Sequence, residues 1–156
     1  EQSWKRRSGT PIRGIEMSNV DWAKDLAQKA HAGQVDKAGR PYFEHLEAVA
    51  SSVEYDDEKV VAYLHDIVED TDYDLKDLFH LGCEKYILEA IDCMTKKKGQ
   101  DYHEYLVQVK SNSLARVVKL ADLRHNSNLN RLPKIYPKDL ERYEKYQKAI
   151  AFLEEK

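Results

Sequence analysis

From Ser18 to the C-terminus, apolar residues recur at helical spacing, and no stretch alternates apolar and polar residues over the length of a useful strand. Ser18, with Asp21 three residues later, is typical of a helix start. Asp56 or Asp57 is expected to cap the third helix, and Asp74 a short fourth one. The pattern predicts helices over residues 18–31, 42–54, 57–70, 75–80, 84–94, 101–110, 113–128 and 137–154. We therefore predict an all-α fold, a single helical bundle of about eight helices.

The chain has 156 residues, enough for one domain, and shows neither an internal repeat nor a linker to a second domain. Residues 1–15 contain the cationic sequence WKRR and are expected to form a flexible leader or an artificial extension before one domain over residues 16–156. Lys and Arg number 25 and Asp and Glu 28, a near balance that argues against a nucleic-acid polymer as partner. Two cysteines exclude a disulfide framework, and no apolar run reaches the ~18–20 residues of a membrane span. These features predict a cytoplasmic protein without a membrane partner.

The third predicted helix carries a polar arc opposite a sharp apolar face. With His65 at 0° and an advance of ~100° per residue, Glu69 falls at ~40° and Asp66 at ~100°. Asp70 falls at ~140° on the same arc. Three carboxylates on one arc repel one another unless a cation lies among them, and a metal ion would relieve that repulsion. A solvated polar face is the alternative interpretation.

The helix predicted over residues 113–128 has apolar residues on almost every side, which is typical of a buried helix. Asp122 would then lie in a medium of low dielectric constant, where an ionised carboxylate needs an ion pair or a metal ion. Lys119 offers the ion pair, three residues earlier along the helix. Asn126 lies one turn beyond Asp122 on the same side, where its uncharged amide is suited to contact a ligand.

Two histidines flank the loop predicted over residues 33–41. His31 ends the first predicted helix, where a histidine usually complements the helix dipole. His45 is expected to be a hydrogen-bonded structural histidine near the site. Two imidazoles and two carboxylates would form a mixed nitrogen and oxygen ligand set, which suits Mn²⁺, Fe or Zn²⁺.

Three segments in order carry a family resemblance. They are HAGQ-x-x-K-x-G-x-PY-x-x-H from His31, LHDIVEDT from Leu64 and VKLAD-x-x-x-N from Val118. Together they resemble the HD-type hydrolase domain of RelA/SpoT homologues, and specifically the stand-alone small alarmone hydrolases of the metazoan SpoT-homologue type. The resemblance covers about residues 18–156.

The resemblance implies an all-helical HD fold and one Mn²⁺ per chain, with Fe or Zn²⁺ as alternatives. It assigns the metal-ligand roles to His31, His65, Asp66 and Asp122. It also implies that Glu69 and Asp70 handle the attacking water. The reaction of that family removes the 3′-pyrophosphate of (p)ppGpp and yields GDP or GTP and pyrophosphate, so a small nucleotide is the expected partner.

The residues expected to contact the nucleotide are Asn126 and the loop cations Lys37 and Arg40, since amide and cationic groups suit base and phosphate contacts. The alternative enzymatic function is hydrolysis of another phosphorylated nucleotide, such as removal of the 2′-phosphate of NADPH. A non-catalytic nucleotide-binding or toxin-neutralising module is the alternative from another class. The Glu69–Asp70 pair argues against it, because a pure binder needs no base. A homo-oligomer is compatible with the sequence.

Overall fold

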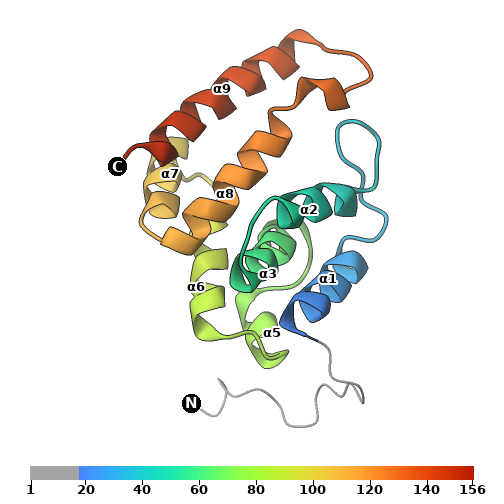
Figure 1. Cartoon of the computed structure of the whole chain (residues 1–156), viewed down its shortest axis with the longest axis vertical. Coiled ribbons are helices and arrows are strands. Elements are labelled where there is room, and N and C mark those ends of the chain that lie inside the picture. Colours follow the sequence, from blue (N-terminus) through green and yellow to red (C-terminus); the bar gives the residue numbers. More distant parts are fainter. Residues whose placement is uncertain (1–17) are drawn as a thin grey trace.

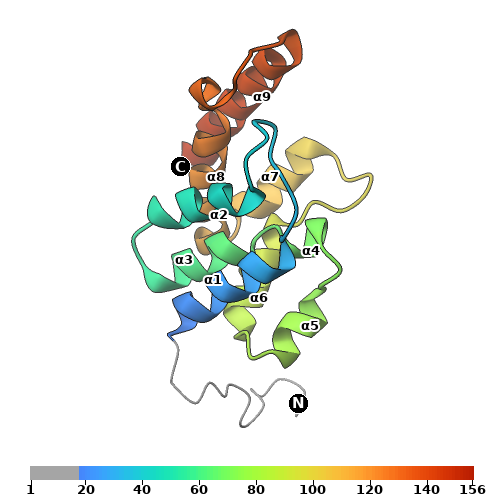
Figure 2. The same cartoon turned by 90° about the vertical axis from the view of Figure 1, so that its right-hand side faces the viewer.

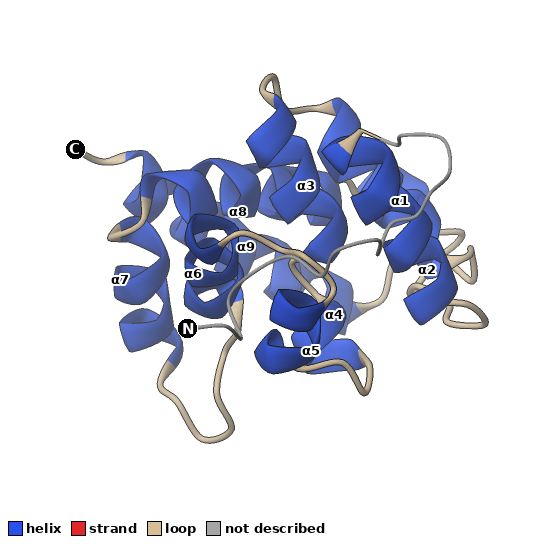
Figure 3. Cartoon of the chain, turned by 90° about the horizontal axis from the view of Figure 1, so that it is seen from below, coloured by secondary structure: helices blue, strands red, loops and turns tan. Residues whose placement is uncertain are grey.

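The structure is a computed structural model that describes residues 18–156 (Figure 1). The leader predicted over residues 1–15 lies outside the described residues. The helices of the described part are α1 (Asn19–Ala30), α2 (Tyr42–Ser51), α3 (Asp56–Leu64), α4 (Ile67–Asp70), α5 (Leu75–His80), α6 (Lys85–Met94), α7 (Tyr102–Lys110), α8 (Ser113–Asn126) and α9 (Pro137–Glu154), with a 3-10 turn over Leu129–Arg131. This part contains helices and loops without a strand, so the predicted all-α fold is confirmed (Figure 3).

Side-chain caps start several of these helices as the sequence predicted. The Ser18 hydroxyl accepts a hydrogen bond from the backbone N–H of Asp21 at 3.1 Å, and the Asp74 carboxylate accepts one from that of Asp77 at 2.8 Å. The cap expected at Asp56 or Asp57 is wrong by one residue, because α3 is preceded by Tyr55. The Glu58 carboxylate accepts from the backbone N–H of Tyr55 at 3.0 Å and therefore closes this helix end from inside its first turn.

Helix α8 lies at the centre of the bundle and packs against α2, α3, α6, α7 and α9 (Figures 1 and 2). Its side chains Ala115, Val118 and Leu123 are buried, whereas Val117 is 39% exposed. Helices α1 and α2 both pack against α3 on the other side of the core. The expected burial of Asp122 is therefore confirmed, whereas the helix is not buried on every side, since one face that includes Val117 stays exposed.

The third predicted helix is interrupted. Helix α3 ends at Leu64, α4 begins at Ile67, and His65 and Asp66 form the turn between them. The backbone of Asp66 has φ −101° and ψ 0°, outside the helical region. The angular positions derived from one continuous helix therefore do not hold beyond His65. The break allows two consecutive side chains to reach one point, which a regular helix would direct ~100° apart.

The loop between α1 and α2 folds back on itself through an isolated antiparallel bridge between Val35 and Pro41. The Asp36 carboxylate accepts hydrogen bonds from the backbone N–H groups of Ala38 and Arg40, at 2.9 and 3.0 Å. Its second oxygen pairs with Arg131 at 2.7 Å, in the segment between α8 and α9. The ion pair between Asp36 and Arg131 therefore joins the loop between α1 and α2 to the segment between α8 and α9. None of the helices described is both long and apolar enough to cross a membrane.

Candidate functional site

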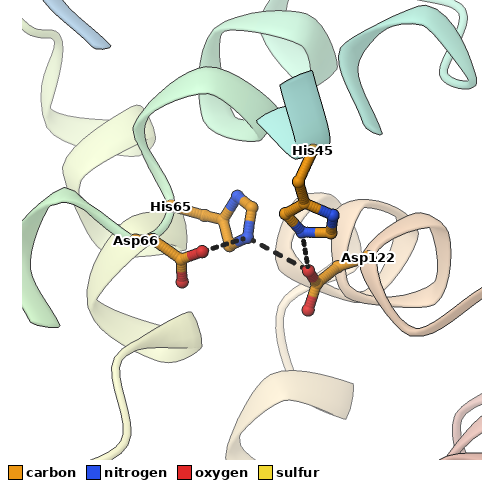
Figure 4. A group of neighbouring side chains, drawn as sticks. All are labelled: His45, His65, Asp66 and Asp122. Atoms are coloured by element: carbon orange, nitrogen blue, oxygen red, sulfur yellow. Dashed lines mark hydrogen bonds and ion pairs between the residues drawn. The ribbon is translucent and has the colours of Figure 1, made fainter. Parts of the chain in front are cut away.

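Four side chains from three separate segments converge inside the bundle (Figure 4). His45 comes from α2, His65 and Asp66 from the turn between α3 and α4, and Asp122 from α8. One ligand atom from each lies within 4.8 Å of the others. His45 Nε2 is 2.7 Å from Asp122 Oδ1, and His65 Nε2 is 3.2 Å from Asp66 Oδ2 and 3.4 Å from Asp122 Oδ1.

The ring of His65 is oriented as in a metal ligand. Its Nδ1 lies 2.7 Å from the carbonyl oxygen of Ala62, which only accepts hydrogen bonds, so Nδ1 carries a proton and Nε2 is the ring nitrogen that faces the site. This Nε2 is buried without a hydrogen-bond partner and faces two carboxylates. Burial lowers the pKa of His65, but two buried carboxylates at this distance raise it by more, and they repel each other unless positive charge lies between them, either a proton on Nε2 or a metal ion. The two imidazoles and two carboxylates fit a divalent transition metal ion.

Asp122 divides its two oxygens between two kinds of partner. Lys119 Nζ lies 3.1 Å from Oδ2, which is the ion pair that the sequence offered as the alternative to a metal. Oδ1 faces the two histidines, 2.7 Å from His45 Nε2, and accepts a hydrogen bond from the Asn126 amide at 3.4 Å. Burial raises the pKa of Asp122, but Lys119 and the histidines outweigh burial and hold the pKa well below its usual value. The ion pair and a metal-binding role are therefore compatible in one carboxylate.

The second carboxylate of the group, Asp66, accepts a hydrogen bond from the phenol of Tyr42 on α2. Burial raises the pKa of Asp66, but the charge and hydrogen bond of His65 lower it by more. The net pKa of Asp66 is therefore below its usual value, which favours the ionised carboxylate. Burial and the Asp66 charge in turn raise the pKa of Tyr42, which keeps its proton and donates it. This contact fixes the orientation of one ligand oxygen.

His31 is not part of the converging group, and the sequence-based assignment of this residue is corrected in favour of His45. His31 Nδ1 bonds to the side-chain oxygen of Gln34 at 2.9 Å, and its buried Nε2 has no hydrogen-bond partner. Its ring lies against Tyr42, with centroids 5.2 Å apart. His45 could have been found from its place in α2, because it shares a face with the buried Val49 four residues later. A histidine on an apolar face needs a polar partner inside the protein.

Glu69 and Asp70, at the end of α4, line the same cavity as Asp66 and Asp122. Partial burial raises the pKa of both carboxyls. Glu69 accepts a hydrogen bond from the backbone N–H of Lys96 at 2.6 Å. The backbone carbonyl of Asp70 accepts one from the Gln34 side chain at 3.0 Å. The pair thus stands beside the converging group and outside it, as the sequence predicted.

The cavity above the group has a volume of about 560 Å³, within the range of small-molecule sites. Its walls come from the loop between α1 and α2, from α2, α4 and α8, and from the segment between α8 and α9 together with the first part of α9. Of the three residues expected to contact a nucleotide, Lys37 and Asn126 line it. Arg40 does not; it pairs with Glu44 at 2.9 Å on the surface. The expectation for Arg40 is therefore not supported by the geometry.

Four cations line the cavity, and three of them already have carboxylate partners. Lys119 pairs with Asp122, Arg131 with Asp36 and Arg142 with Asp139. Lys37 makes no ion pair with any described residue. The sequence did not indicate Arg131 or Arg142, because the segment between α8 and α9, which carries Arg131, and helix α9, which carries Arg142, reach the cavity only through the tertiary fold.

Sequence relatives of this chain include proteins of nucleotide metabolism. A protein of Haemophilus influenzae named guanosine-3′,5′-bis(diphosphate) 3′-pyrophosphohydrolase is 31% identical over 115 residues, which are 65% of this chain and 17% of that protein. The bifunctional (p)ppGpp synthase/hydrolase SpoT of Escherichia coli is 30% identical over 115 residues, 65% of this chain and 16% of that protein. A Streptomyces coelicolor protein named GTP pyrophosphokinase is 28% identical over 134 residues, 78% of this chain and 16% of that protein. The chain spans about one sixth of the length of these curated relatives.

A solved structure has the same fold. It is described as a metazoan orthologue of SpoT that hydrolyses ppGpp, and it is 21% identical in sequence with a TM-score of 0.73. The match covers 89% of this chain and 86% of that one. No protein-family model matches the chain. The structural match confirms the predicted helical HD fold.

Proposed function

Starting from the confirmed relationship of this chain to RelA/SpoT homologues, we propose that it is a metal-dependent (p)ppGpp 3′-pyrophosphohydrolase, which releases GDP or GTP and pyrophosphate. The observation that carries the proposal is the convergence of two imidazoles and two carboxylates beside the Glu69–Asp70 pair, in a cavity of nucleotide size. A nucleotide-binding module without catalysis would need neither the buried ligand set nor a base beside it.

The residues proposed to hold the metal are His45, His65, Asp66 and Asp122, with Mn²⁺ as the proposed ion. Such an ion acts as a Lewis acid on a phosphoryl oxygen and lowers the pKa of water toward ~7. His65 and Asp66 are positioned by the backbone of α3 and the phenol of Tyr42, and Asp122 is held by Lys119. The protein therefore supplies ligands whose orientation is fixed before the ion arrives.

Glu69 and Asp70 are proposed to act on the attacking water. A carboxylate whose pKa is raised by burial holds a proton more readily at neutral pH, which suits a general base. We assign proton abstraction to Glu69, whose Oε1 is held by the Lys96 N–H, and orientation of the water to Asp70. The proton of the water then moves to the Glu69 carboxylate as the oxygen attacks phosphorus and the bond to the 3′-oxygen breaks; the 3′-oxygen takes up a proton from solvent to become the 3′-hydroxyl of GDP or GTP, and pyrophosphate leaves.

Lys37 and Asn126 are proposed to bind the nucleotide. Lys37 makes no ion pair with a described residue and can contact a phosphate, and Asn126, whose amide donates to Asp122 Oδ1 at 3.4 Å, lines the cavity at the end of α8. We expect Lys37→Ala to raise KM severalfold with a smaller effect on kcat, because its contact exists before and during the reaction. Arg40→Ala is the matched control and should leave KM unchanged, since its partner is Glu44. Equal effects of the two substitutions would contradict this placement of Lys37.

The test of the function is a substrate screen with purified protein and Mn²⁺. The substrates are ppGpp, pppGpp, NADPH and GTP, and pyrophosphate and orthophosphate are followed separately. The proposal expects pyrophosphate from ppGpp and pppGpp, abolished by EDTA and restored by Mn²⁺. Orthophosphate from NADPH alone would assign the chain to the 2′-phosphatase alternative. Tight nucleotide binding without turnover would identify a non-catalytic module.

A further inference from the structure

The candidate ligand His45 contacts a second histidine on its other side. Its Nδ1 lies 2.6 Å from Nδ1 of His125, and the two ring centroids are 4.8 Å apart. His125 lies in the last turn of α8, three residues beyond Asp122, and is half-buried. The contact therefore joins α2 directly to the last turn of α8.

Two ring nitrogens at this distance share one proton, so one donates and the other accepts. His45 Nε2 points at the converging group, 2.7 Å from Asp122 Oδ1. If Nε2 binds a metal ion it cannot carry a proton, and the proton of the neutral ring must then lie on Nδ1. The N–H group of His45 Nδ1 points at His125 Nδ1, so His125 Nδ1 must accept this hydrogen bond. The neutral His125 ring then carries its proton on Nε2.

The two candidate histidine ligands differ in what holds them. His65 is fixed by a backbone carbonyl, which no substitution of Ala62 would remove. His45 is fixed by the side chain of His125, and a substitution of His125 can remove the acceptor atom. The difference makes the support of His45 open to direct test.

We infer that His125 is a positioning residue, which accepts a hydrogen bond from His45 Nδ1–H and so presents the lone pair of His45 Nε2 to the metal site. The inference rests on the metal site of the proposed function and adds a residue outside the ligand set. It assigns His125 no contact with the substrate or the reacting atoms.

The test compares His125→Leu with His125→Asn, two side chains of nearly equal shape. The Asn amide oxygen keeps an acceptor near the position of Nδ1, whereas Leu removes it. Titration of the metal-free proteins with Mn²⁺ or Zn²⁺ in a calorimeter should show affinity about 10- to 100-fold lower for His125→Leu. His125→Asn should stay near the wild type, and His103→Leu, an exposed substitution on α7, is the control. Equal affinities of His125→Leu and the wild type would overturn the inference.

A second measurement uses the wild-type protein, so its result does not depend on whether a variant folds. In ¹⁵N-labelled wild-type protein loaded with Zn²⁺, long-range ¹H–¹⁵N spectra report which ring nitrogens carry protons. The inference requires a proton on His45 Nδ1 and none on His125 Nδ1, and the opposite arrangement overturns it. If the wild type binds the ion with this tautomer but hydrolyses no nucleotide, the proposed function fails and the role of His125 stands. A wild type that binds no ion overturns both.

Discussion

His31 and His45 are both buried, and their surroundings separate them at the scale of single atoms. His45 directs Nε2 at Asp122, whereas His31 bonds through Nδ1 to Gln34 and lies outside the converging group. The sequence singled out His65 and Asp66 from the polar arc of one helix and Asp122 from its place in an apolar helix, and the structure brings these three side chains together. The sequence could not choose between two histidines at the ends of one loop, since the choice depends on which ring turns toward α8.

We therefore expect His45→Ala to lose bound metal and His31→Ala to keep it. The reason is that His45 supplies a ligand atom within 4.8 Å of the other three. Metal content after gel filtration, measured by mass spectrometry, decides the question, with circular dichroism as the check on folding. His65→Ala should behave like His45→Ala. A full site in His45→Ala together with an empty one in His31→Ala would restore the assignment made from the sequence.

Glu69 supports a prediction that separates catalysis from metal retention. Glu69→Gln keeps the shape of the side chain and its acceptor for the Lys96 N–H but cannot take up a proton. We expect full metal content and a turnover at least ~100-fold lower, as for loss of a general base. The matched control is Glu89→Gln on α6, an exposed glutamate outside the cavity. Near-normal turnover in the combined variant Glu69→Gln, Asp70→Asn would mean that these two carboxylates are solvated surface groups without a part in catalysis.

At the scale of elements, helix ends were predictable and the break in the third helix was not. Capping residues such as Ser18 and Asp74 act through local contacts, so the sequence carries them. Residues 60–70 contain neither glycine nor proline, and their periodicity continues through the turn at His65 and Asp66. The interruption is instead accompanied by contacts from other elements, among them the Tyr42 phenol on Asp66. Local propensity gave no signal for these contacts.

The loop before α2 also reaches α4 through one side chain. The Gln34 Oε1 atom accepts a hydrogen bond from His31 Nδ1–H at 2.9 Å, and the Gln34 Nε2 atom donates one to the Asp70 carbonyl at 3.0 Å. We expect Gln34→Met to lower the free energy of unfolding by about 1–2 kcal/mol, because two hydrogen bonds are lost. It should also lower kcat without loss of metal, since α4 carries Glu69 and Asp70.

Gln108→Met is the matched control for that substitution. Gln108 donates to the backbone carbonyl of Cys93 at 2.8 Å and lies outside the cavity. Denaturant unfolding should show comparable losses of stability for the two variants, whereas only Gln34→Met should reduce kcat. An unchanged kcat in Gln34→Met would show that the loop does not position α4.

At the scale of the whole molecule, the site joins positions 45, 65–66 and 122, which only the tertiary fold brings together. Periodicity predicted the helices that carry these residues and the burial of Asp122, but not which faces meet. The family resemblance supplied that information, and it also transferred the ligand role to the wrong histidine of the loop. Arg131 and Arg142 had no such guide, because they reach the cavity from the chain between α8 and α9 and from α9 itself.

The charges that line the cavity determine the order in which a cation and a nucleotide bind. Six carboxylates and four cations face it, so the metal-free protein repels a polyanionic nucleotide, and a divalent cation offsets the excess. The cation should therefore bind first and the nucleotide second. Titration of Glu69→Gln with ppGpp should give an affinity at least tenfold higher with Mn²⁺ than in EDTA, a coupling of about 1.4 kcal/mol. Equal affinities would mean that the two ligands bind independently. With ordered binding, the level of free metal ion sets the fraction of protein that is able to capture substrate.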